Sequence, residues 1–113
     1  MPLFEMSLAE LKTYQGRNPR PADFDEYWDG ALAEMRALDA KVELVPSEFT
    51  AAAAECFELY FTGVGGARIH AKYLRPKSAA KPHPAVVEFH GYSGNSGDWA
   101  PKLKWVSQGF SVA

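Results

Sequence analysis

The residues best suited to chemistry lie in a short loop that follows an apolar run. The run is Ala85–Phe89, and the loop, His90–Gly97, contains glycines at positions 91, 94 and 97. Glycine lets the backbone adopt positive φ angles and approach a ligand closely. Backbone N–H groups in such a loop can donate hydrogen bonds to the negatively charged oxygen that develops during acyl transfer. The loop is therefore the first candidate for a functional site.

One established way to bind that oxygen uses an N–H group from a His-Gly type loop after the third strand of an α/β-hydrolase sheet. In this sequence the pattern predicts the backbone N–H of Tyr92 as the donor. Gly91 and His90 would then position the loop, the histidine by holding it so that the Tyr92 N–H points into the site. A plain strand-to-turn junction is the alternative, because His-Gly pairs are common.

Other reactive side chains fit known sites less well. Ser93 and Ser96 lie in the same loop, but neither has the second glycine that a nucleophile elbow requires two residues after its serine. The three histidines and Cys56 show no metal-ligand spacing. The loop also lacks both the dinucleotide-binding glycine pattern and a P-loop lysine. We therefore expect no metal and no cofactor.

A strand, loop, helix and strand in succession would position the candidate loop. The β-branched run at Ala85–Phe89 predicts a strand buried on both faces of a parallel sheet. Pro101 fits the first turn of a helix that Gly109 ends, and Phe110–Ala113 begins another strand. The inner face of that helix is predicted to include Leu103, Trp105 and Val106. Ligands of open α/β sheets bind at the carboxyl ends of strands, where this loop lies.

Two helices are predicted near the N-terminus. Ser7 and Glu10 form a capping-box pattern ahead of a short helix over residues 8–14. Asp23 can cap a second helix that extends to Leu38. Apolar residues recur on one face of this helix at Phe24, Tyr27, Trp28, Ala31, Leu32, Met35 and Leu38. Such a stripe is typical of a core face, with a subunit contact as the alternative.

Strands are predicted from residue 42 onward. Leu44–Phe49 contains Pro46 and should therefore lie at a sheet edge. Residues 57–62 alternate between apolar and polar, and residues 68–75 follow after the glycine-rich turn Gly63–Gly66. The two segments predict an antiparallel hairpin.

Several spaced motifs together resemble a known family. They are Pro2–Leu11, Asp23–Trp28, Gly66–Ile69 and Phe89–Tyr92, in that order along the chain. The sequence resembles the acetyl xylan esterases and cephalosporin C deacetylases of carbohydrate esterase family seven, over nearly its whole length. The resemblance implies a serine esterase of α/β-hydrolase fold that removes acetyl groups from small sugars and from an antibiotic side chain. It also implies that the Tyr92 N–H contributes to the oxyanion hole.

The resemblance predicts the N-terminal portion of an α/β-hydrolase domain over residues 1–113. A helical extension would occupy residues 1–40, and the first strands, the oxyanion loop and the first covering helix would occupy residues 41–113. The family's G-x-S-Q-G nucleophile elbow and its acidic and histidine partners are expected beyond Ala113. The 113 residues alone are therefore predicted to be inactive.

Composition limits the partners. Twelve basic and 14 acidic residues give a net charge of −2, which argues against nucleic acid. The sequence has no signal-peptide core and no apolar stretch long enough to span a bilayer, and its one cysteine, Cys56, fits a reducing compartment. These features predict a cytoplasmic protein that acts on a small acetylated carbohydrate or acetyl ester, without membrane contact.

An alternative function remains open at this point. The aromatic helix at residues 24–38 also fits a non-catalytic assembly or sugar-binding module, and Trp99 at the entry of the later helix could stack on a sugar or pack on the sheet. A strand at the end of the chain would leave an unpaired edge, which favours association. A homo-oligomer is therefore expected under either function.

Overall fold

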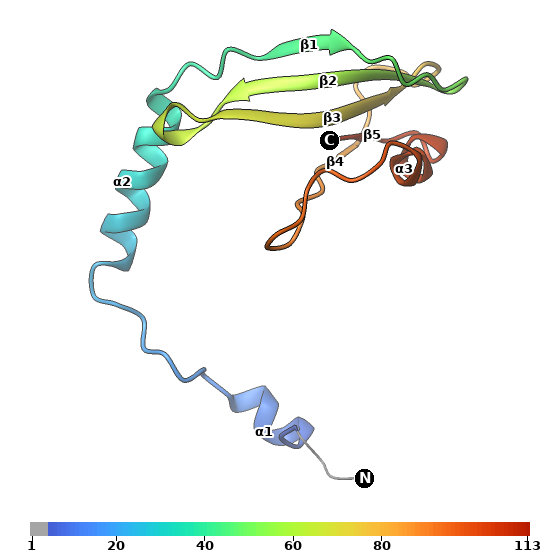
Figure 1. The fold of residues 1–113 in the computed structure, drawn as a ribbon. Coiled ribbons are helices and arrows are strands. Elements are labelled where there is room, and N and C mark those ends of the chain that lie inside the picture. Colours follow the sequence, from blue (N-terminus) through green and yellow to red (C-terminus); the bar gives the residue numbers. More distant parts are fainter. Residues whose placement is uncertain (1–4) are drawn as a thin grey trace. The chain divides into compact units, whose positions relative to one another are not determined.

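The computed structural model describes residues 5–113 (Figure 1). The chain divides into two compact units, the first 33 residues and residues 34–113. The sheet and the candidate loop both belong to the second unit. The boundary expected near residue 40 stays a prediction.

Helix α1, Leu8–Thr13, begins at the expected capping box. The hydroxyl of Ser7 accepts a hydrogen bond from the backbone N–H of Glu10 at 3.4 Å. In return, the Glu10 carboxylate accepts one from the Ser7 N–H at 2.9 Å. These reciprocal bonds occupy N–H groups that have no partner inside the helix, so the local sequence alone determines where α1 starts.

Helix α2, Phe24–Ala37, confirms the second predicted helix. None of its residues is buried. Phe24 and Tyr27 each contact Trp28, with ring centroids 6.2 and 5.7 Å apart respectively, yet all three side chains are exposed. The predicted apolar stripe therefore exists on α2, and three of its aromatic rings contact one another.

Five strands form one mixed sheet in the order β1-β2-β3-β5-β4 within the described residues (Figure 1). They are β1 Glu43–Pro46, β2 Ala54–Thr62, β3 Arg68–Pro76, β4 Ala85–Val86 and β5 Ser111–Val112. Neighbouring strands from β1 to β3 are antiparallel, β5 pairs antiparallel with β3, and β4 pairs parallel with β5. This confirms the predicted hairpin followed by a parallel strand–helix–strand unit.

Local residues explain where the hairpin turns and where the sheet stops. The turn between β2 and β3 is the short 3-10 helix η1, Val64–Gly66, in which Gly65 and Gly66 have φ angles of 69° and 77°. Strand β1 lies at one edge of the sheet and ends at Pro46, which has no N–H to donate to a further neighbour. Both features follow the sequence prediction.

The buried core lies on one face of the sheet. Leu74 of β3 pairs with Val112 of β5, and both are fully buried. The 3-10 helix η2, Ala100–Lys102, leads into helix α3, Leu103–Ser107, whose Val106 joins them in the core. Gly109 follows α3 with a φ of +83°, as expected for a helix end. The predicted covering helix is thus confirmed.

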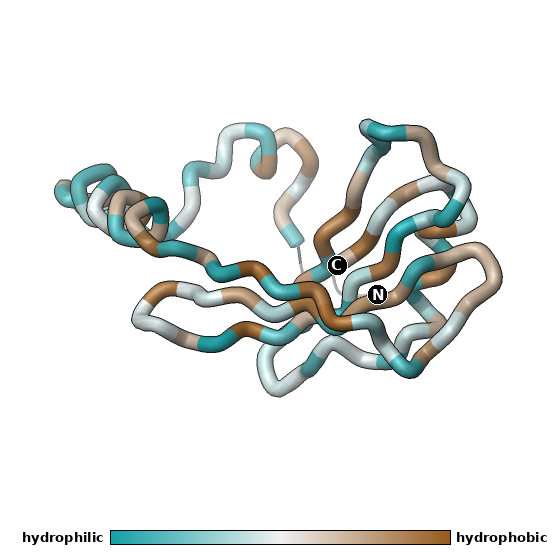
Figure 2. Tube along the Cα trace, turned by 90° about the horizontal axis from the view of Figure 1, so that it is seen from above, coloured by the Kyte–Doolittle hydropathy of each residue, from teal (hydrophilic) through white to brown (hydrophobic). Residues whose placement is uncertain are grey.

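The other face of the hairpin is also apolar. The register pairs Phe57 with Tyr73, Leu59 with Ala71 and Phe61 with Ile69, so these side chains share one face. They are exposed or half-buried. Hydrophobic residues recur along the strands in Figure 2. Apolar alternation therefore identified the strands correctly but not the face that α3 covers.

The strand expected at residues 85–89 differs from its prediction. β4 comprises only Ala85 and Val86, and the side chains of Val87 and Phe89 are 62% and 90% exposed. β4 is the last strand of the sheet and has a neighbour on one side only. The expectation of burial on both faces is therefore wrong for the described residues.

Candidate active-site loop

A tight turn presents Tyr92 at the start of the candidate loop. The Gly91 carbonyl oxygen accepts a hydrogen bond from the Gly94 N–H at 2.9 Å, which closes a four-residue turn. Ser93, at the third position, has a φ of +62°, and Tyr92, at the second, does not have a positive φ. This combination is typical of a type II turn.

His90 packs against the same turn. Its Nδ1 lies 2.9 Å from the Gly91 carbonyl oxygen, which can only accept, so the ring nitrogen donates. A Cβ on Gly94 would lie 3.2 Å from the His90 Cβ and 3.3 Å from its Nδ1. The turn and the imidazole are therefore in close contact, and glycine at position 94 makes this contact sterically feasible.

The N–H of Tyr92 has no hydrogen-bond acceptor among residues 5–113. The Tyr92 side chain is fully exposed to solvent. A backbone donor without an internal partner can donate to water or to an anionic ligand. The chemistry available to this turn is therefore hydrogen-bond donation from the backbone.

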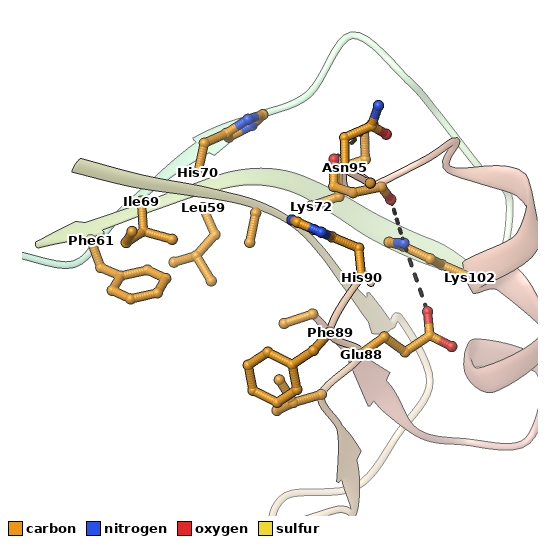
Figure 3. A pocket seen from close by; sticks show the side chains of 15 residues that line it. Leu59, Phe61, Ile69, His70, Lys72, Glu88, Phe89, His90, Asn95 and Lys102 are labelled. Carbon is orange, nitrogen blue, oxygen red and sulfur yellow. Dashed lines mark hydrogen bonds and ion pairs between the residues drawn. The ribbon is translucent and has the colours of Figure 1, made fainter. Parts of the chain in front are cut away.

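A hollow of about 850 Å³ borders the loop (Figure 3). Its apolar wall comes from both the hairpin and the segment after β4, and includes Leu59, Phe61, Ile69, Val87 and Phe89. Its polar side chains include His70, Lys72, Glu88, His90, Asn95 and Lys102. His90 lines the hollow, whereas Gly91 and Tyr92 are not among its lining residues. The structure thus brings one of the three predicted site residues to the hollow.

Two lysines contact the far end of the loop. Lys72 of β3 donates hydrogen bonds to the Gly97 carbonyl oxygen and, at 3.3 Å, to the Ser96 hydroxyl. Lys102 of η2 donates to the Ser96 carbonyl oxygen at 2.8 Å. The Asn95 side chain accepts from the Gly97 N–H at 2.7 Å, which closes a local turn. Contacts from the sheet and from η2 therefore meet at Ser96 and Gly97.

Glu88 links this region to α3. Its carboxylate accepts a hydrogen bond from the Trp105 indole N–H at 2.7 Å and lies 3.5 Å from Lys104 Nζ and 3.7 Å from Lys102 Nζ. The indole hydrogen bond is the largest cause that lowers the pKa of Glu88, and the charges of Lys104 and Lys102 lower it further, whereas desolvation acts in the opposite direction. Glu88 is therefore held as a carboxylate beside the hollow.

Comparison with known proteins shows which family the chain belongs to. The family model described as "Acetyl xylan esterase (AXE1)" matches residues 1–113, the whole chain. The chain belongs to the acetyl xylan esterase family. This confirms both the family resemblance and the N-terminal α/β-hydrolase fold class read from the sequence.

Two solved acetyl xylan esterases are similar to this family member. Acetyl xylan esterase 1 from Thermoanaerobacterium sp. JW/SL YS485 is 60% identical, with a TM-score of 0.89 over 96% of this chain and 34% of its own. The acetyl xylan esterase from Paenibacillus sp. R4 is 32% identical, with a TM-score of 0.79 over 95% of this chain and 35% of its own. The chain thus spans about a third of the length of these relatives.

The remaining histidines of this esterase-family chain have structural partners. Nε2 of His70 lies 2.5 Å from the Glu58 carboxylate, and its ring stacks on Tyr60. His83 lies 2.7 Å from the hydroxyl of the buried Ser111, a contact that the sequence did not reveal. No group of three or more potential metal-ligating side chains occurs among the described residues.

Trp99 and Trp105 pack against the core rather than form an open platform. Trp99 stacks on Phe49 with centroids 5.5 Å apart, and both pack against the core. Trp105 also packs against the core and donates to Glu88. The packing alternative for Trp99 is therefore the one the structure adopts.

None of the helices described for residues 5–113 is long and apolar enough to cross a membrane.

Sequence reasoning missed Glu88, Lys72 and Lys102. One signal was available, because a carboxylate inside the apolar run at residues 85–89 requires polar partners if the run is a strand. The two lysines gave no local signal. Their partners lie 24 and six residues away along the chain.

Proposed function

We propose that this chain supplies the oxyanion-binding loop of a serine esterase that removes acetyl groups from acetylated sugars. The donor is the backbone N–H of Tyr92, and His90 and Gly91 position it. The observation that carries the proposal is the N–H of Tyr92, which is unpaired within residues 5–113 and lies in a turn that His90 contacts. The names of the two similar structures support acetylated xylan as the substrate class.

In the proposed reaction the Tyr92 N–H acts where negative charge develops on the acetyl carbonyl oxygen, first when serine attacks and again when water does. A serine hydroxyl attacks the acetyl carbonyl carbon while a histidine, oriented by an aspartate, takes the serine proton. The carbonyl oxygen becomes an oxyanion and accepts the hydrogen bond from Tyr92. Collapse expels the sugar alkoxide, which takes the proton from the histidine, and water then releases acetate. We place the serine, histidine and aspartate outside these 113 residues, and no cofactor is needed.

A chimeric enzyme tests this proposal. The chain replaces the matching segment of the Thermoanaerobacterium enzyme, which it resembles at 60% identity. Tyr92→Pro removes the N–H while retaining a turn, since proline is common at the second position of type II turns. Tyr92→Phe keeps the N–H and the aromatic ring. We expect Tyr92→Pro to lower kcat for acetylated xylan oligosaccharides by about 100- to 1000-fold.

The control makes the result specific. Tyr92→Phe should retain activity within about twofold of the unsubstituted chimera, because the donor is a backbone group. Equal activity of the proline and phenylalanine variants, both folded by circular dichroism, would mean that the Tyr92 N–H is not the donor. The 113 residues alone should give no acetyl-ester hydrolysis above the uncatalysed rate.

We also propose a cytoplasmic homo-oligomer. The single cysteine is buried and unpaired, which fits a reducing compartment. The exposed aromatic rings of Tyr27 and Trp28 on α2 fit a contact with a second copy. Light scattering after size exclusion tests the assembly. We expect the paired substitution Tyr27→Ser and Trp28→Ser to shift the chain to monomer, and an unchanged mass would exclude this face as the contact.

A further inference from the structure

The candidate loop, His90–Gly97, makes few hydrogen bonds to other elements within residues 5–113. Within the described residues, the hydrogen bonds inside His90–Gly97 join Gly94 to Gly91, His90 to Gly91, and Gly97 to Asn95. All three are local. Positive φ angles at Ser93 and Gly97 also show that the loop follows no regular secondary structure. Its position must therefore be fixed by contacts from elsewhere.

Two side chains provide every hydrogen bond from His90–Gly97 to another element among residues 5–113. Lys72 reaches the loop from β3 and bonds the Gly97 carbonyl and the Ser96 hydroxyl. Lys102 reaches it from η2 and bonds the Ser96 carbonyl. Both donors carry a full charge, and charge-assisted hydrogen bonds are stronger than neutral ones.

Burial gives the Lys102 contact particular weight. Lys102 is only 8% exposed, although lysine is rarely buried without a partner. Its ammonium group lies 2.8 Å from the Ser96 carbonyl oxygen. It also lies 3.7 Å from the Glu88 carboxylate (Figure 3). Breaking either contact would leave a buried charge poorly compensated. The Lys102 side chain therefore has a strong preference for this one position of the loop.

We infer that Lys72 and Lys102 are positioning residues that clamp the loop and so fix the Tyr92 N–H. This inference rests on the proposed function of Tyr92. The clamp holds Ser96 and Gly97 at the end of the loop, while His90 and the type II turn hold its beginning. Preorganised donors stabilise a transition state without reorganisation during reaction, so a loosened clamp should reduce kcat more than substrate affinity.

Hydrogen exchange on the 113-residue chain tests the clamp without any activity. Lys72→Met and Lys102→Met each keep the aliphatic stem and remove the donor. Lys104→Met is the matched control, because Lys104 also lies near Glu88 but makes no contact with the loop. We expect the Gly94 and Gly97 amides to exchange at least about tenfold faster in the first two variants and unchanged in the control. Core amides of β2 and β3 report whether the fold is intact.

The chimeric enzyme supplies the second measurement. Lys72→Met and Lys102→Met should each lower kcat at least about tenfold with KM within about twofold, whereas Lys104→Met should leave both constants unchanged. Lys72 is only half-buried, so its replacement is less disruptive than that of the buried Lys102. If Lys102→Met does not fold, the Lys72→Met variant alone tests the clamp. The inference is overturned if the Gly94 and Gly97 amides exchange at an unchanged rate in a folded Lys72→Met chain. It is also overturned if these amides exchange faster but kcat is unchanged. If Tyr92→Pro retains activity, the proposed function fails, whereas the exchange data still report on the clamp.

Discussion

The amide nitrogen of Gly94 lies 2.9 Å from the carbonyl oxygen of Gly91. This hydrogen bond closes the turn that carries Tyr92, and it brings the Gly94 Cα close to His90. A Cβ built on Gly94 would lie 3.0 Å from the Gly91 oxygen, closer than nine in ten real Cβ contacts. The geometry of the turn therefore depends on the absence of a side chain at position 94.

Gly94→Ala should destabilise the chain by about 1–3 kcal/mol, because the methyl group must push aside backbone and imidazole atoms. Gly91→Ala is the control, since a Cβ there has no neighbour within 4 Å and Gly91 has no positive φ. Its effect should stay within about 0.5 kcal/mol. Urea unfolding measures both values, and equal values for the two variants would contradict the steric argument.

Local signals allowed much of the fold to be predicted. Ser7 and Glu10 mark the start of α1, Pro46 marks an edge strand, and Gly109 marks the end of α3. Each of these residues determines only the structure of its near neighbours along the chain, because it acts through capping, a missing N–H or a positive φ. The pairing of β2 with β3 also followed from a short glycine-rich turn. Features with a local physical cause are thus readable from sequence.

The features that position the candidate loop are not local. Lys72 is hydrogen-bonded to Ser96, which lies 24 residues away in the sequence. Glu88 is hydrogen-bonded to Trp105, which lies 17 residues away. These contacts depend on how β3, η2 and α3 pack, which no spacing in the sequence encodes. Burial of the run at residues 85–89 was misjudged for a related reason, since it depends on neighbours across the sheet rather than on composition.

Leu74→Ala should cost about 2–5 kcal/mol of unfolding free energy, because the leucine is fully buried beside Val112 and Val106. Leu44→Ala makes the same chemical change on the edge strand β1, where the side chain is 43% exposed. Its cost should be below about 1 kcal/mol. Similar losses at both positions in urea titrations would show that the core does not lie on the α3 face.

Glu88 should make stability depend on acidic pH. Its pKa in the folded chain is below the ordinary 4.5, so its ionised form stabilises the fold above that value. The contribution is lost as pH falls through the lowered pKa. Glu88→Gln keeps an oxygen that can accept from Trp105 but has no charge. The variant should therefore be less stable than the parent at pH 7, and the difference should shrink below the ordinary pKa of 4.5.

Thermal unfolding at several pH values from about 7 to about 3 measures this difference. The comparison removes the shared effects of other carboxylates, such as Glu55, whose pKa is also lowered by its hydrogen bond with Arg75. Lys104→Met should reduce the gap between the parent and the Glu88→Gln variant only slightly, since Lys104 is well exposed. A difference that grows toward the acidic end of this range has the wrong sign and rules out a stabilising carboxylate.

Cys56 should react slowly with alkylating reagents in the folded chain. Its side chain is only 8% exposed, and burial raises the pKa of the thiol, although the charge of Lys77 partly offsets this. The thiolate is the reactive form, so both burial and the raised pKa slow the reaction. We expect labelling by iodoacetamide at about pH 8 to be at least about 100-fold slower in buffer than in about 6 M urea. Leu74→Ala should accelerate the reaction in buffer, because both residues belong to the same core. Rapid labelling of the native parent chain would show that the α3 side of the sheet opens readily and is not a stable core.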